Sequence, residues 1–140
     1  MANIHGKNTS VYVEDSSAAC QALSVDGNSI TWTESDAHPE ITGFGDAGVQ
    51  RSSSSISDAR LSYEGFASDT GTTGNLEVLN EIKGRVGLVQ WGPNGSSSGN
   101  VKYSACMVLD DAEIGAPVNG IVTARGTFSL ASGSVTKGTW

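Results

Sequence analysis

Residues 56–66 are the segment that most constrains the fold of this chain. Their sequence, ISDARLSYEGF, alternates apolar and polar side chains. One side carries Ala59, Leu61 and Tyr63, and the other carries Asp58, Arg60, Ser62 and Glu64. Such alternation is typical of a β-strand with one face on a core and the other in water. The chain is therefore predicted to contain a sheet with one polar face.

A long polar loop precedes this strand. Residues 35–55 contain Gly43, Gly45 and Gly48 and end in a run of four serines. Connections longer than about 15 residues without secondary structure are uncommon in compact domains unless they are functional or disordered. We therefore expect this loop to make contact between subunits.

Further strands follow from alternating or β-branched residues bounded by turn residues. They are predicted at 9–14, 23–34 (interrupted by a turn or bulge at 26–28), 85–91, 101–109 and 118–130. Residues 110–117 are expected to connect the last two strands, and the Gly/Ser/Thr-rich residues 131–140 to form a tail.

One short helix is expected at 73–83. Leu76, Leu79 and Ile82 recur at spacings of three, and Gly84 follows directly. This pattern predicts an amphipathic helix with a C-terminal stop, able to cover one side of a sheet. With no linker dividing the 140 residues, the chain is predicted to be one mainly β domain, a β-sandwich or partial barrel with one short α-helix.

Charge and composition exclude several classes. The formal net charge is -7, and the eight Lys and Arg residues are scattered singly, so binding to nucleic-acid phosphates has no electrostatic basis. The N-terminus lacks the apolar core of a signal peptide, and no apolar run is long enough to span a membrane. Cys20 and Cys106 follow no metal spacing and are expected to be reduced and largely buried.

A search for catalytic chemistry is negative. His5 and His38 have no neighbouring ligands at metal spacing, and the acidic residues 110–113 do not match a calcium loop. The glycines of residues 43–46 lack the following helix that a phosphate loop requires. No GxSxG nucleophile motif occurs. We expect a protein that is not an enzyme and binds no cofactor or metal.

Three tryptophans leave an alternative open. Trp32, Trp91 and Trp140 could stack on sugars, which would indicate a carbohydrate- or receptor-binding module of sandwich type. We favour the interpretation that Trp32 and Trp91 fill the core or a subunit seam, because large buried aromatics dominate both. Trp140 is expected to be exposed and to need a partner surface.

Three segments, taken in order, resemble the major tail protein, or tail tube protein, of long-tailed, siphovirus-like bacteriophages. They are EITGFGDAGVQ with the following SISDARLSYEGF, then NLEVLNEIKG, and then VKYSACMVLDDAEIGAPVNGIVTARGTFSLASGSV. The resemblance covers residues 23–138. It implies hexameric rings, closed by an inner β-barrel to which each subunit contributes strands, stacked into a tube that carries DNA into the host. Contractile-tail and secretion-system inner tubes share this architecture and are the nearest alternative.

The resemblance also implies roles for individual segments. Residues 35–55 match an inter-ring loop, and residues 1–8 and 131–140 match terminal arms, with Trp140 as an arm contact. The candidate inter-ring residues are Glu40, Phe44, Asp46, Val49 and Arg51. The candidate lumen residues are Asp58, Arg60, Glu64, Asp110, Asp111 and Arg125, in a lumen whose acidic field repels phosphates.

The implied partners are other copies of the chain and other tail proteins at the two ends of the tube. A tape measure protein and DNA would pass through the lumen without specific binding, and no membrane is involved. The implied location is the virion tail, after assembly in the bacterial host cytoplasm.

Overall fold

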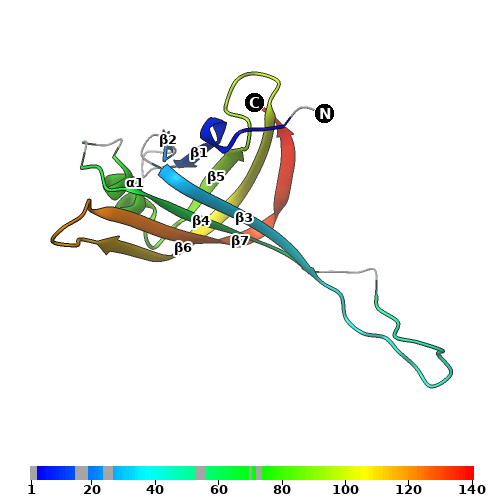
Figure 1. Ribbon diagram of the computed structural model, residues 1–140. Helices are drawn as coiled ribbons and strands as arrows, with labels where there is room; N and C mark the ends of the chain where they lie inside the picture. Colours follow the sequence, from blue (N-terminus) through cyan, green and yellow to red (C-terminus); the bar gives the residue numbers. More distant parts are fainter. Residues whose placement is uncertain (1–2, 15–18, 24–26, 53–55, 70, 72–73) are drawn as a thin grey trace.

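A computed structural model describes residues 3–14, 19–23, 27–52, 56–69, 71 and 74–140. Within these ranges the chain is mainly β with one α-helix, as predicted (Figure 1). The elements, in chain order, are the 3-10 turn η1 (Gly6–Asn8), β1 (Ser10–Glu14), β2 (Cys20–Ala22), β3 (Gly27–Ala37), β4 (Ile56–Phe66), α1 (Asn75–Ile82), β5 (Val86–Gly92), β6 (Val101–Gly115) and β7 (Thr123–Thr139).

All seven strands belong to one antiparallel sheet with the order β2-β1-β5-β6-β7-β4-β3. The sheet does not stay flat. The pairing of β6 with β7 shifts register near Cys106 and again between Leu109 and Asp111, and such bulges bend strands and increase their twist. Both strands change direction along their length in Figure 1, so the sheet rolls over itself as a partial barrel.

The core lies inside this roll. Side chains from strands that are far apart in the sheet meet there, including Val11 and Val13 of β1 and Leu61 of β4. Met107 of β6 and Phe128 of β7 are fully buried in this core. On β4 the predicted alternation is confirmed, since Ala59, Leu61 and Tyr63 are buried while the residues between them face outward.

Helix α1 covers one side of the roll. Its buried residues are Asn75, Val78, Leu79 and Ile82, so the predicted apolar stripe is confirmed for Leu79 and Ile82. A Cβ at Gly126 of β7 would lie 3.0 Å from a Leu79 methyl carbon, so the small residue lets the helix pack closely on the sheet. The helix is two residues shorter than predicted at its start and one at its end.

A buried polar network anchors the start of the helix. Asn75 Oδ1 accepts from the Ser68 amide at 2.9 Å, and its Nδ2 donates to the Phe66 carbonyl at 2.6 Å and to Tyr63 Oη at 3.1 Å. Tyr63 Oη in turn donates to the Leu23 carbonyl at 2.9 Å. The network joins the helix to the end of β4 and to the residue after β2. Burial of Asn75 is affordable because both ends of its amide are satisfied.

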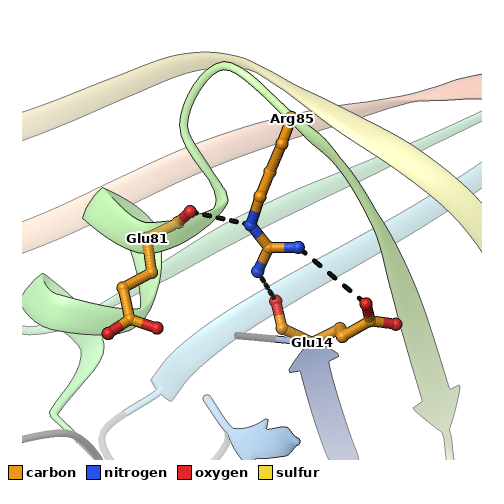
Figure 2. Close-up of polar contacts among 3 residues, drawn as sticks. All are labelled: Glu14, Glu81 and Arg85. Atoms are coloured by element: carbon orange, nitrogen blue, oxygen red, sulfur yellow. Dashed lines mark hydrogen bonds and ion pairs between the residues drawn. The ribbon is translucent and has the colours of Figure 1, made fainter. Parts of the chain in front are cut away.

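Arg85 holds the other end of the helix (Figure 2). Its Nε donates to the Glu81 carbonyl at 2.9 Å, and one terminal nitrogen donates to the Glu14 carbonyl at 2.6 Å. The other terminal nitrogen lies 3.9 Å from the Glu14 carboxylate. One guanidinium thus joins the last turn of α1 to the end of β1.

Several predicted boundaries are wrong. The predicted connection at 110–117 is largely strand, since β6 runs to Gly115. The last strand begins at Thr123 rather than 118, because Pro117 to Gly120 forms a turn closed by a bond from the Gly120 amide to the Pro117 carbonyl. It then continues to Thr139 through the predicted tail. The predicted loop is also shorter, because residues 35–37 extend β3.

The predicted turn at 26–28 lies partly outside the described residues, and β3 already includes Gly27. Residues 53–55 of the serine run lie outside them as well. Cys20 and Cys106 are both exposed, so the expected burial is wrong. Within the described ranges, no helix has the length and apolarity needed to cross a membrane.

Candidate assembly interface

The outward side of four neighbouring strands forms a largely polar surface, called the polar face below. Paired residues in an antiparallel sheet share a face, so the register places Glu113, Arg125, Glu64 and Ser29 in one row across β6, β7, β4 and β3. The next row is Asp111, Thr127, Ser62 and Thr31, and a third is Val108, Ser129, Arg60 and Thr33. Asp58 follows on β4 beside Ser35.

Most of the candidate lumen residues come together on this surface. The polar face carries Asp58, Arg60, Glu64, Asp111 and Arg125, which are distant in sequence. Asp110 is exposed but sits at the register shift beside Asp111. Glu113 joins the set and was missed because residues 110–117 were expected to be a loop. Its spacing of two from Asp111 was the signal that a strand continued.

Arg125 is paired within its own subunit. Its Nη2 lies 3.5 Å from Glu64 Oε1, and both side chains are substantially exposed. An exposed pair of this kind contributes about 0–1 kcal/mol to stability. The pair removes one positive and one negative group from the outward field, so the other three carboxylates of the face outnumber Arg60.

Two strand edges flank the polar face. Strand β3 is the last strand of the sheet, so its outer edge has no partner strand among the described residues. On the other side, β5 pairs with β6 only as far as Val108. Residues 111–115 of β6 therefore pair with β7 alone within the described part of the chain. Free backbone donors and acceptors on both sides make this face a template for further strand pairing.

Residues 38–52, called the finger below, project from the end of the β3–β4 hairpin (lower right in Figure 1). The finger is held by its own backbone. The Ile41 amide donates to the Gln50 carbonyl at 2.9 Å, and the Ser52 amide donates to the Pro39 carbonyl at 2.8 Å. Glu40 and Arg51 also face each other in an isolated β-bridge.

All five candidate inter-ring residues are exposed on the finger. Asp46 closes its tip by accepting from the Gly43 amide at 2.6 Å. Phe44 lies beside this turn and is completely exposed. The structure therefore places an ordered, apolar-tipped projection where the sequence predicted a loop.

The C-terminus is folded back on the subunit. The Trp140 amide donates to the Asn100 carbonyl, and its ring lies edge-on to Tyr12 with centroids 5.3 Å apart. Lys102 Nζ lies 5.3 Å from the ring centroid. A Cβ at Gly92 would collide with Trp140 Nε1 and lie 2.9 Å from the Gly95 carbonyl oxygen, so only glycine leaves room for the indole. Trp140 is half-buried, and the expectation of an exposed residue is wrong.

The remaining tryptophans face each other. Trp32 and Trp91 are stacked with centroids 5.6 Å apart, and Tyr103 lies beside both. Both indoles pack against the core cluster, which confirms the preferred interpretation over a sugar-stacking platform. Among the described residues, no three His, Cys, Asp or Glu side chains lie together as a metal site would require.

No protein-family model matches the chain, and no curated protein matches it in sequence. Solved structures do match its fold. A chain of the virion of a native gene transfer agent particle superposes with a TM-score of 0.78 at 13% identity, covering 99% of this chain and 100% of that one.

A chain from the tail of an empty gene transfer agent particle, refined with C6 symmetry, gives 0.77 at 12% identity over 96% of this chain and 98% of that one. A chain of the SPP1 tail tube gives 0.73 at 12% identity over 99% of this chain and 80% of that one. The rolled sheet with its helix is therefore a fold that this chain shares, over nearly its whole length, with chains of the gene transfer agent virion and tail and of the SPP1 tail tube.

Proposed function

We propose that this protein is the structural subunit of a phage tail tube, in which hexameric rings stack into the conduit for DNA ejection. The observation that carries the proposal is the polar face with a free strand edge on each side. A sheet segment that is polar on one side, apolar on the other and unpaired at both edges is suited to become one sector of a closed barrel. The fold shared with tail proteins, one of them in a C6-symmetric tail, supports the same assignment.

In the proposed ring, the outer edge of β3 in one copy pairs with residues 111–115 of β6 in the next. This contact is heterologous, because it joins two different surfaces, and repeated rotation closes it into a ring. Closure satisfies the backbone groups that each isolated subunit leaves open, and removes edges that would otherwise recruit other strands. The polar face then lines the lumen.

The lumen would repel DNA rather than bind it. Each copy contributes Asp58, Asp111 and Glu113 outside the Arg125–Glu64 pair, with Arg60 opposing them. A ring of six copies carries six times the formal charge of -7. Such a field keeps phosphates from adhering to the wall during passage.

The remaining roles follow from this arrangement. The finger reaches an adjacent ring. Residues 1–8 and the exposed part of residues 131–140 reinforce contacts between copies, while Trp140 itself packs on Tyr12 of its own subunit. Other tail proteins bind the two ends of the tube, and a tape measure protein occupies the lumen before DNA passes. The protein acts in the virion tail, after assembly in the cytoplasm of the bacterial host.

Electron microscopy and sedimentation of the purified chain test the proposal. Hexameric rings or tubes of uniform diameter, with an axial hole, are the expected result at high protein concentration. A species that stays monomeric across the concentration range would contradict the proposed function. A contractile-tail or secretion-system tube would be distinguished by an outer sheath that binds the assembled tube.

A further inference from the structure

The exposed large apolar side chains of this chain are not scattered. Of the ten in the described residues, three lie on the finger and five lie around the β6–β7 turn. The finger residues are Ile41, Phe44 and Val49, and those around the turn are Phe66, Ile114, Val118, Ile121 and Val122. Contiguous exposed apolar groups of this kind mark interaction sites more often than isolated ones do.

The two groups lie at opposite ends of the polar face. The finger continues from the Ala37 end of β3, which pairs with the first residue of β4. The β6–β7 turn lies at the other end of β4, where Phe66 pairs with Thr123. Eleven strand residues separate the two ends by about 33 Å. Figure 1 shows the finger and the turn projecting in opposite directions.

Both groups are poor in charge. Residues 114–122, called the hairpin tip below, contain no charged side chain, and residues 41–49 contain only Asp46. The Asp46 carboxylate is engaged by the Gly43 amide within the finger. Burying the two surfaces against each other would therefore place only one charged group in the contact, the Asp46 carboxylate, which already accepts a hydrogen bond.

The flanks of the two surfaces are complementary in charge. Arg51 stands at the base of the finger and Glu113 directly precedes the hairpin tip, and both are exposed. The ion pairs of the described residues, Arg85 with Glu14 and Arg125 with Glu64, involve neither of them. A contact between the apolar surfaces brings one positive and one negative flank together, which orients the two copies.

We infer that the finger of one copy binds the hairpin tip of a copy in the adjacent ring, and this inference rests on the proposed tube. The partner is a second copy of this chain, because each copy presents both surfaces at its two ends. A contact between unlike ends leaves a finger unused on one side and a tip unused on the other. It therefore propagates along the axis without closing. The finger's own hydrogen bonds preform its shape and lower the entropy lost on binding.

Disulfide trapping tests the contact directly. In a Cys20→Ser, Cys106→Ser background, Phe44→Cys and Val118→Cys are combined in one chain, and assembled tubes are oxidised. The expected product on a non-reducing gel is a ladder of covalent multimers, because each copy links to the next in the stack. The matched control combines Phe44→Cys with Ser98→Cys, which is exposed in the β5–β6 loop. It is expected to give no ladder.

The single variants identify the geometry. Phe44→Cys alone and Val118→Cys alone should each remain monomeric on the gel, whereas a cross-linked dimer from either would reveal a contact between like surfaces and overturn the inference. Tubes that form normally but give no ladder from the 44/118 pair would also overturn it, while leaving the proposed function intact. Failure of the unmodified chain to form rings or tubes would instead refute the proposed function.

A charge exchange provides a second readout. Arg51→Glu and Glu113→Arg should each shorten tubes by placing like charges together, and the double variant should restore their length. Short tubes from both single variants without recovery in the double would contradict the proposed orientation. If every variant still forms rings of normal size, shorter tubes reflect weaker contact between rings and not a folding defect.

Discussion

Trp32 and Trp91 lie face to face, with ring centroids 5.6 Å apart and planes 8° from parallel, although β3 and β5 have three strands between them in the sheet. The stack is possible only because the sheet rolls over and brings its separated strands together. The contact between the two indoles therefore depends on closure of the rolled sheet and not on either strand alone. One face of each indole is covered by the other indole, and Tyr103 lies beside both rings.

Replacing Trp91 with Ala should destabilise the subunit by about 3 kcal/mol, since a large aromatic packed on the core is lost together with its stacking partner. Trp91→Phe retains a stacked ring and should cost about 1–2 kcal/mol less. Urea unfolding of the subunit, followed by circular dichroism, measures the difference. Equal stability of wild type and Trp91→Ala would show that the stack does not hold the roll closed.

Removing residues 41–50 should leave the subunit folded but prevent rings from stacking into tubes. Glu40 and Arg51 are already paired, so an Asn-Gly turn can join them as a two-residue hairpin. All the removed residues are exposed, so the melting temperature should change by no more than a few degrees. Electron microscopy is expected to show rings without long tubes.

A control for this deletion is the same Asn-Gly replacement within the exposed β5–β6 loop at residues 96–98, which should leave tubes unaffected. Long tubes from the finger-deleted chain would show that another surface joins the rings. An unfolded product would show that the finger stabilises the subunit.

Asn75→Ala should be among the most destabilising single changes at the helix. The substitution removes the Asn75 side chain that bonds the Ser68 amide and the Phe66 carbonyl. We expect it to lower the free energy of unfolding by about 2–4 kcal/mol. Tyr63→Phe removes one hydroxyl from the same network and should cost about 1–2 kcal/mol. Thermal unfolding of the two variants side by side tests this order, and a larger loss for Tyr63→Phe would contradict it.

Arg85→Lys should cost about 1–2 kcal/mol, because a lysine amine cannot reproduce the guanidinium bonds to the Glu81 and Glu14 carbonyls at once. Glu14→Gln should change stability by less than about 1 kcal/mol, because its carboxylate stands 3.9 Å from Arg85 and the pair is partly exposed. Urea midpoints at low and high salt distinguish the two. A strong salt dependence of wild-type stability that Glu14→Gln abolishes would show that the ion pair, not the carbonyl bonds, dominates.

The sequence by itself determined the local patterns of this protein. Strict alternation identified the buried side of β4, since neighbouring strand residues point to opposite faces. The three-residue spacing of Leu79 and Ile82 with the following Gly84 identified α1, because helix faces repeat every three to four residues. The glycine- and serine-rich run between two strands identified a long connection at residues 35–55, although not its projection from the sheet or its internal hydrogen bonds.

Only the tertiary structure decided where β6 and β7 end. The two aspartates at 110–111 favoured a loop in the sequence. In the structure a register shift lies beside Asp111, and β6 continues through both residues because its backbone still pairs with β7. Apolar residues argued for a strand from Val118, but the turn at Pro117 to Gly120 delays it to Thr123. Pairing with the start of β6 likewise converts the polar tail into strand up to Thr139.

The polar face, its two free edges and the Trp32–Trp91 stack depend on which strands become neighbours. That choice is made by burial of the shared core and by backbone pairing between residues far apart in the sequence, such as Ser10 and Gly92. No local pattern records such long-range pairing. The sequence therefore supplied a polar strand face, and the rolled sheet assembled it into a surface that can join copies of the chain.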